Sequence, residues 1–284
     1  MKKRILIAMS IIGLGLFAVN CDDNPTYIHG DYYPPRVTGV VSITGDQAVQ
    51  ILWDPIYLDD IAYYKIWYAP ETADPSNPHA YTYIADVSAS HSSWTDYDVE
   101  NGTTYYYVIT AVNDGGYESE MSDYVMDTPR PEGYDVTIYD YHDAAHLDRT
   151  GYDLYAHERL PYTSADCDFY VDYDTSYESF FITVRFDDYY IQDFGYASNF
   201  DDIGYAPPSG WSNFYGIEAI EGHMYILKLY HFNQFHYAKV WITDLNADDG
   251  TMRFSWAYQT DPENRELKVV PGNQILKKDI NAVN

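Results

Sequence analysis

The chain has 284 residues, of which 44 are acidic and 16 basic, so its net charge is −28. So acidic a chain is unsuited to phosphate groups, and we expect no nucleic-acid partner. Its length suits two domains of ordinary size. Only two cysteines are present, so the hydrophobic cores must supply most of the stability. Tyrosine, with 33 residues, is unusually abundant and favours β-strands.

The first residues are typical of an exported protein. Basic residues at 2–4 precede an apolar run at 5–19, which is too short to span a membrane comfortably. Cys21 follows, and residues 18–21 (AVNC) resemble a bacterial lipobox, in which the cysteine is lipidated and becomes the first residue of the mature protein. The resemblance predicts a lipoprotein signal peptide at 1–20 and a lipid anchor on Cys21. A plain cleaved signal or an uncleaved anchor is the alternative.

The next segment has no hydrophobic period and is rich in acidic residues, Pro and Gly. We interpret residues 21–33 as a tether that reaches at most ~40 Å when extended. Removal of the leader would bring the net charge near −31, so the lipid rather than electrostatic attraction would hold the protein at an acidic membrane. We therefore expect a lipid-anchored protein of the cell envelope, at the outer membrane or cell surface.

Residues 34–128 show short alternating segments separated by turn residues, which is typical of an all-β sandwich. Strands are predicted at 37–43, 49–53, 61–68, 81–87, 92–95, 103–112 and 122–126. No amphipathic helical period of useful length occurs in the chain, so the fold class is predicted to be all-β.

Four pieces of this region, in their order and spacing, resemble a fibronectin type III domain. They are residues 53–55 (WDP), 64–68 (YKIWY), 101–112 (NGTTYYYVITAV) and 118–122 (ESEMS). The resemblance implies an immunoglobulin-like sandwich in which Trp53 is the core tryptophan of the second strand and Tyr105 supplies the tyrosine corner. Both roles are structural, and most bacterial copies of the domain look like spacers or docking surfaces.

A second antiparallel β-rich domain is predicted at 134–260, after a linker at 129–133 and before a weakly ordered tail at 261–284. Its clearest element is a meander. The strands of the whole domain are predicted at 134–141, 166–173, 179–186, 189–194, 222–230, 235–245 and 251–259. The first two strands of the meander are apolar on both faces, so we expect them to lie centrally under a second sheet.

Three short segments of the meander faintly resemble the closing strands of HmuY-like lipoprotein domains. They are residues 222–225 (GHMY), 236–240 (HYAKV) and 253–259 (RFSWAYQ). Some members of that family bind haem, but no axial ligand can be aligned here, so the resemblance gives no expectation of haem.

A long aromatic connection at 197–215 is the first candidate binding site. Trp211, Tyr205 and Tyr215 would form a platform for a sugar ring, and Asp201 and Asp202 would accept its hydroxyl protons. The alternative is that the tryptophan closes one end of the sandwich.

An Asp-rich turn is the second candidate. Asp244, Asn246, Asp248 and Asp249 offer oxygen atoms of the kind that bind Ca²⁺. We favour a hairpin turn without metal, because Asp-Gly is a usual turn pair and the glycine that an EF-hand loop requires is missing.

Two groups of histidines are also candidate metal or haem ligands: His142, His146 and His157, and His223, His231 and His236. Solvated loop or interstrand histidines are the favoured interpretation, since no HExxH motif or sustained helix supports the first group.

Catalysis has little support in the sequence. No nucleophile elbow, phosphate loop or dinucleotide fingerprint occurs, and Cys167 is flanked by acids that disfavour a reactive thiolate. We therefore predict a non-enzymatic binding or adhesion module whose C-terminal domain recognises a glycan or a protein. The alternatives are a haem or metal scavenger and a self-assembling surface-layer or fibre subunit.

Overall fold

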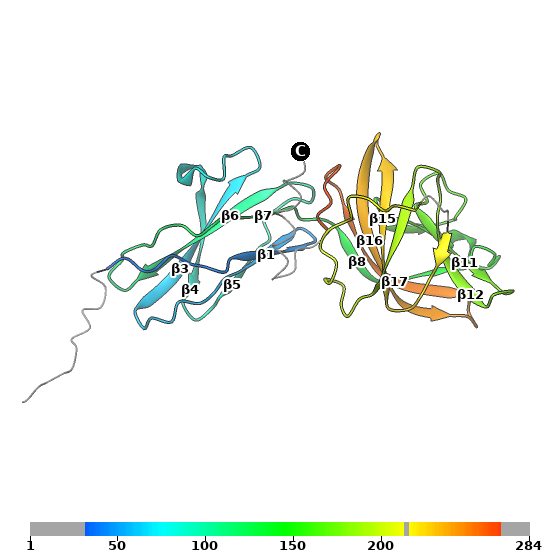
Figure 1. Ribbon diagram of the computed structural model, residues 1–284, viewed down its shortest axis with the longest axis horizontal. Helices are drawn as coiled ribbons and strands as arrows, with labels where there is room; N and C mark the ends of the chain where they lie inside the picture. Colours follow the sequence, from blue (N-terminus) through cyan, green and yellow to red (C-terminus); the bar gives the residue numbers. More distant parts are fainter. Residues whose placement is uncertain (1–31, 213–215, 268–284) are drawn as a thin grey trace, which may run out of the picture.

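The computed structural model describes residues 32–212 and 216–267. The predicted signal peptide, the lipidation site Cys21, Tyr215 and the last residues of the predicted tail lie outside the described residues. Figure 1 shows two β-rich units joined end to end. Within the described residues the chain forms seventeen strands and two 3-10 helices, and every strand pairing is antiparallel, so the predicted fold class is confirmed. No described helix is long and apolar enough to cross a membrane.

The first domain is a sandwich of a three-stranded and a four-stranded sheet. The first sheet has the order β1 (Val41–Gly45), β2 (Ala48–Leu52) and β5 (Ser93–Asp96). The second has the order β4 (Thr82–Ser88), β3 (Ile61–Pro70), β6 (Tyr105–Asn113) and β7 (Val125–Asp127). A 3-10 helix, η1 (Pro78–Ala80), precedes β4. Each predicted strand of this domain corresponds to an observed one within a few residues.

The core of this domain contains the two residues that the fibronectin type III resemblance singled out. Trp53 is buried, and its ring meets that of Tyr64 edge to face at 5.3 Å between centroids. The Tyr105 hydroxyl accepts a hydrogen bond from the Glu100 backbone N–H at 3.0 Å, which is the contact of a tyrosine corner. Tyr107, two residues further along β6 and on the same face, is fully buried.

The predicted linker at 129–133 is instead a short, buried junction. Arg130 is fully buried beside Glu132, and β8 (Glu132–Tyr139) already begins within the predicted linker. The Arg130 N–H donates to the Gly45 carbonyl at 3.1 Å, and the Gly102 N–H donates to the Pro129 carbonyl at 2.8 Å. A Cβ on Gly102 would lie 2.6 Å from the Thr260 hydroxyl, so the two domains touch closely here.

The second domain is a sandwich of two five-stranded sheets. One sheet has the order β13 (Tyr190–Tyr196), β15 (His223–His231), β16 (Gln234–Asn246), β17 (Thr251–Gln259) and β8. The other has the order β10 (Glu158–Leu160), β9 (Gly151–Asp153), β11 (Phe169–Asp174), β12 (Ser179–Val184) and β14 (Gly216–Glu218). A 3-10 helix, η2 (Leu147–Arg149), precedes β9. Strands β9, β10 and β14 were not predicted, because three-residue strands carry almost no periodic signal.

The main core lies between these sheets and follows the alternation of the strands. In β16, Ala238, Val240 and Ile242 point into it, and in β17 Phe254 and Trp256 do the same. The opposite face of the meander is buried as well, which confirms that its strands lie centrally. A second sheet covers only one face of the meander.

The other face is covered by the long connection together with the start of the predicted tail. Phe200 and Ala206 from the connection and Leu267 from the tail pack with Met224 of β15. Residues 261–267 are therefore an ordered part of the domain, contrary to the prediction, because their burial depends on contacts with a distant loop. The Leu267 N–H donates to the Gly204 carbonyl at 2.8 Å.

A buried lysine ties this cover to the sheet. Lys239 of β16 is fully buried, and its Nζ donates to the Phe200 carbonyl at 2.6 Å and to the Ile203 carbonyl at 3.3 Å. The ammonium also lies 4.1 Å from the centre of the Phe200 ring. These contacts offset the cost of removing the lysine ammonium group from water, and they fix the position of the long connection.

Candidate functional site

A groove of about 570 Å³ lies where edge strands of the two C-terminal sheets meet. Strand β8 is the edge of one sheet and β10 the edge of the other. The lining comes from β8, η2, β9 and β10 and includes Tyr134, Asp135, Asp148, Arg149, His157, Glu158 and Arg159. Both of these sheet edges are rich in charged residues here, so polar side chains line both walls of the groove.

The groove has the composition of a site for a polar ligand. Arg149 and Arg159 supply hydrogen-bond donors, while carboxylates from each wall supply acceptors. Tyr134 is 54% exposed, and its hydroxyl donates to the Glu132 carboxylate at 2.6 Å. The ring of His157 packs 4.9 Å from Trp256, and burial lowers the pKa of His157.

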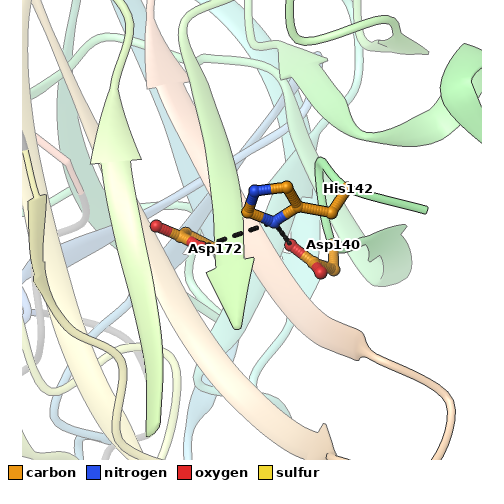
Figure 2. A group of neighbouring side chains, drawn as sticks. All are labelled: Asp140, His142 and Asp172. Carbon is orange, nitrogen blue, oxygen red and sulfur yellow. Dashed lines mark ion pairs between the residues drawn. The ribbon is translucent and has the colours of Figure 1, made fainter. Parts of the chain in front are cut away.

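A second surface site lies where the chain passes from one sheet to the other. Directly after β8, Asp140 forms a parallel bridge to Val171 of β11, and the Tyr141 N–H donates to the Val171 carbonyl at 3.0 Å. This crossing brings His142 over Asp172 of β11. Figure 2 shows the His142 ring between the carboxylates of Asp140 and Asp172. Its Nδ1 lies 3.5 Å from Asp140 Oδ1 and 3.9 Å from Asp172 Oδ1.

The electrostatics of this Asp140–His142–Asp172 cluster favour a cation. Burial first, and the neighbouring Asp140 carboxylate second, raise the pKa of Asp172. In the described part of the chain, His142 is the one basic side chain within 4.0 Å of either carboxylate. The sequence suggested His142 with His146 and His157, but His146 pairs with Asp143 at 2.9 Å and His157 lines the groove.

The three histidines of the meander do not converge on one ligand. His223 lies at the far end of β15 from His231 and pairs with Asp193 at 3.0 Å. His231 and His236 are neighbours, with ring centres 6.0 Å apart; both nitrogens of His231 are hydrogen-bonded to protein groups, whereas Nε2 of His236 is buried without a hydrogen-bond partner among the residues that the structure describes. His236 Nδ1 is hydrogen-bonded to the Gln259 carbonyl at 3.1 Å.

His231 belongs to a buried network that could not be predicted from the sequence. Its Nε2 lies 2.7 Å from Asp168 Oδ1, and its Nδ1 lies 2.7 Å from the Tyr258 hydroxyl. The second oxygen of Asp168 accepts the Leu154 N–H at 2.7 Å. Burial raises the pKa of Asp168, whereas the hydrogen bond with His231 lowers it. This Asp168–His231–Tyr258 network joins β17 to the opposite sheet and lies within the domain.

The predicted aromatic platform is part of the packed cover. The ring of Trp211 lies 6.0 Å from that of Tyr237 and packs against the cluster under the long connection. Tyr205 pairs through its backbone with Glu266, and burial raises the pKa of its phenol. Asp202 accepts hydrogen bonds from the backbone and side chains of Ser198 and Asn199, and the Asp201 N–H donates to Asn199 Oδ1 at 2.8 Å.

The Asp-rich turn is the hairpin loop between β16 and β17. Asp244 pairs with Arg253 at 3.0 Å, and Asn246 Oδ1 accepts the backbone N–H groups of Asp248 and Asp249. The Asn246 amide in turn donates to the Asp249 carboxylate at 2.9 Å. Asn246 Oδ1 and the Asp249 carboxylate are therefore directed into the turn itself, as in other Asx turns.

No protein-family model and no curated protein matches the chain. Among solved structures, it is similar to an Fn3-like protein from Clostridium thermocellum, with 24% identity, 34% of this chain and 95% of that one covered, and a TM-score of 0.27. The fn3 domain of human contactin 1 is similar with 16% identity, coverage of 33% and 75%, and a TM-score of 0.29. A β-1,2-glucanase from Parabacteroides distasonis has 26% identity over 35% of this chain, a TM-score of 0.29, and only 13% of its own length covered.

Each of these similarities covers about a third of the chain. The first domain has a fibronectin type III-like fold, because it is a sandwich of two antiparallel sheets with Trp53 in its core and the Tyr105 hydrogen bond of a tyrosine corner.

Proposed function

We propose that this protein is a lipid-anchored binding protein of the cell envelope whose C-terminal domain recognises a glycan in the groove between β8 and β10. The leader and Cys21 support the anchor. The strongly acidic composition supports attachment of the protein to the membrane by a lipid rather than by electrostatic attraction. The observation that carries the recognition half is the groove itself, about 570 Å³ and lined by polar and aromatic side chains.

The arrangement of the domains suits this role. In Figure 1 the first described residues lie at the end of the fibronectin type III-like domain that is farthest from the second domain. A lipid at Cys21 would therefore place the C-terminal sandwich away from the membrane. The tight junction at Arg130 supports a stiff stalk rather than two freely jointed domains.

A glycan suits the groove better than an apolar ligand does. Sugars present hydroxyl groups that both donate and accept, and the groove alternates arginines with carboxylates. Exposed Tyr134 adds a ring face against which a sugar can pack. We propose binding without catalysis, because Asp148 is exposed and paired with Arg149 at 3.4 Å, whereas a general acid needs a desolvated carboxyl group.

A glycan array probed with the full chain in mild detergent tests the recognition half. We expect binding that Tyr134→Ala or Arg159→Ala weakens about tenfold, or about 1.4 kcal/mol. The matched control is Tyr177→Ala, which removes an exposed tyrosine outside the groove. Capture of a protein from intact cells with no glycan signal would move the ligand class to proteins. No signal in either assay would refute a recognition role.

Metabolic labelling with palmitate tests the anchor separately. The wild-type chain should incorporate the label and fractionate with membranes, and Cys21→Ser should do neither. Label that persists in the variant would place the lipid elsewhere, and label absent from the wild type would point to a plain signal sequence.

A further inference from the structure

We propose that Asp140, His142 and Asp172 form a binding site for a divalent transition-metal ion, for which Zn²⁺ is the reference. The three ligand atoms lie within 4.8 Å of one another. Two ligands bound to zinc at ~2.0–2.1 Å in tetrahedral geometry are about 3.3–3.4 Å apart. The distances from His142 Nδ1 to the two carboxylate oxygens, 3.5 and 3.9 Å, are close to that separation (Figure 2). An ion would therefore enter with small shifts of these side chains.

The backbone holds two of the three ligands in position. Asp140 Oδ1 accepts the Tyr173 N–H at 3.3 Å, and the Asp140 N–H donates to the Gly250 carbonyl at 2.7 Å. The His142 ring rests on that of Tyr141, with centres 3.8 Å apart. Asp172 lies on β11, in register with Phe181 of β12. Ligands fixed in this way lose little freedom when an ion binds, which favours affinity.

Charge favours an ion at this position over the histidine alone. The carboxylates of Asp140 and Asp172 lie 3.5 and 3.9 Å from the same imidazole nitrogen and repel each other. His142 offsets this repulsion with at most one positive charge, and its side chain is 61% exposed. A divalent ion brings two charges and sits between all three donors, so it relieves the repulsion more completely.

The donor set selects the class of ion. One imidazole nitrogen and two carboxylate oxygens suit zinc and the neighbouring first-row ions, whereas Ca²⁺ and Mg²⁺ bind sites built from oxygen atoms. Three protein ligands leave at least one coordination position open. Because His142 faces solvent, water or a donor atom from a partner would fill that position. The site uses none of the groove residues, so it stands independently of the glycan proposal.

Calorimetric titration of ZnCl₂ into the untagged full chain, kept in mild detergent and freed of metal by a chelator, tests the site. We expect saturable zinc binding that weakens at least about tenfold in His142→Gln and in Asp172→Asn. His146→Gln is the matched control, because His146 also pairs with an aspartate nearby but lies outside the cluster. Titration with CaCl₂ should give weaker binding that His142→Gln leaves unchanged.

The alternative is a histidine that only forms an ion pair with the two aspartates. Absence of saturable zinc binding by the wild type, or equal zinc affinity in wild type and His142→Gln, would overturn the proposal in favour of that ion pair. Co²⁺ provides a second measurement, because its visible absorption reports nitrogen and oxygen ligation directly. The exposed position of His142 means that its variant should fold, which circular dichroism checks.

Discussion

Two of the groups in which a histidine of the C-terminal domain meets aspartate lie in opposite surroundings. In the Asp168–His231–Tyr258 network the Asp168 side chain is 1% exposed and both ring nitrogens of His231 have partners at 2.7 Å. In the Asp140–His142–Asp172 cluster the histidine side chain is 61% exposed and its nearest carboxylate oxygen is 3.5 Å away.

The difference separates stability from binding. Each group of the buried network is satisfied by protein, so the network contributes to holding the two sheets together and has no position open to a ligand. The surface cluster concentrates charge that its own residues neutralise incompletely, so it contributes little to the fold and is open to an ion. Similar residues thus acquire different roles from burial and from the number of hydrogen bonds.

The largest expected effect is that of His231→Ala. Removal of the imidazole leaves the buried Asp168 carboxyl and the Tyr258 hydroxyl without their partner, which should lower the free energy of unfolding by about 3–5 kcal/mol. Urea denaturation followed by circular dichroism measures the change. A loss below about 1 kcal/mol would mean that the buried network, like the surface cluster, contributes little to the stability of the fold.

The reactivity of Cys167, which precedes Asp168, should show how closed this region is. The thiol is fully buried, and burial is the main cause that raises its pKa from 9.0 to about 12. Three units correspond to roughly a thousandfold less thiolate near pH 8. Iodoacetamide should therefore leave Cys167 unmodified in the native chain and modify it in urea, as peptide mapping would show. Modification of the native chain at the urea rate would contradict this.

The same shift of pKa gives a pH dependence whose sign is fixed. The folded state keeps the thiol neutral, so this contribution to stability is complete below about pH 9 and is lost as the pH rises toward 12. Cys167→Ala should lose less stability than the wild type does between those values. An equal loss in both chains would assign the alkaline destabilisation to other groups.

A smaller loss is expected for Tyr258→Phe. The ring remains in the core, but the hydroxyl that partners His231 Nδ1 at 2.7 Å is removed, and an unpaired buried polar group costs about 1–2 kcal/mol. Tyr177→Phe, at a tyrosine that is 74% exposed, is the control and should change stability by less than about 0.5 kcal/mol. Equal effects of the two substitutions would show that the Tyr258 hydroxyl is not part of the network.

The first domain was largely predictable from sequence because its signals are local. Trp53 and Tyr105 could be assigned from motif spacing, and the structure places the first in the core and gives the second its backbone hydrogen bond. The three meander strands could likewise be placed from the sequence, since a period of two survives in any antiparallel sheet.

The surface cluster could not be predicted, because it depends on pairing between distant strands. Asp140 and Asp172 are 32 positions apart in the sequence and meet only through the bridge of Asp140 to Val171. His142 was a candidate ligand in the sequence, but it was grouped with His146 and His157, which are close to it in the sequence. The chain here leaves a strand and crosses between sheets, so the neighbours of His142 come from a distant strand instead. Burial of Lys239 and Leu267 was missed for a similar reason, since both are covered by residues far away in the sequence.

The smallest expected effect is that of His142→Ala without metal. The side chain is mostly exposed and its ion pairs are long, so the free energy of unfolding should change by less than about 0.5 kcal/mol. Zinc at about a hundred times its dissociation constant should then stabilise the wild type by about 2.7 kcal/mol, and the variant far less. Thermal denaturation with and without ZnCl₂ measures both quantities. A loss above about 2 kcal/mol in the metal-free variant would make the surface cluster a structural ion pair, and the contrast with the buried network would disappear.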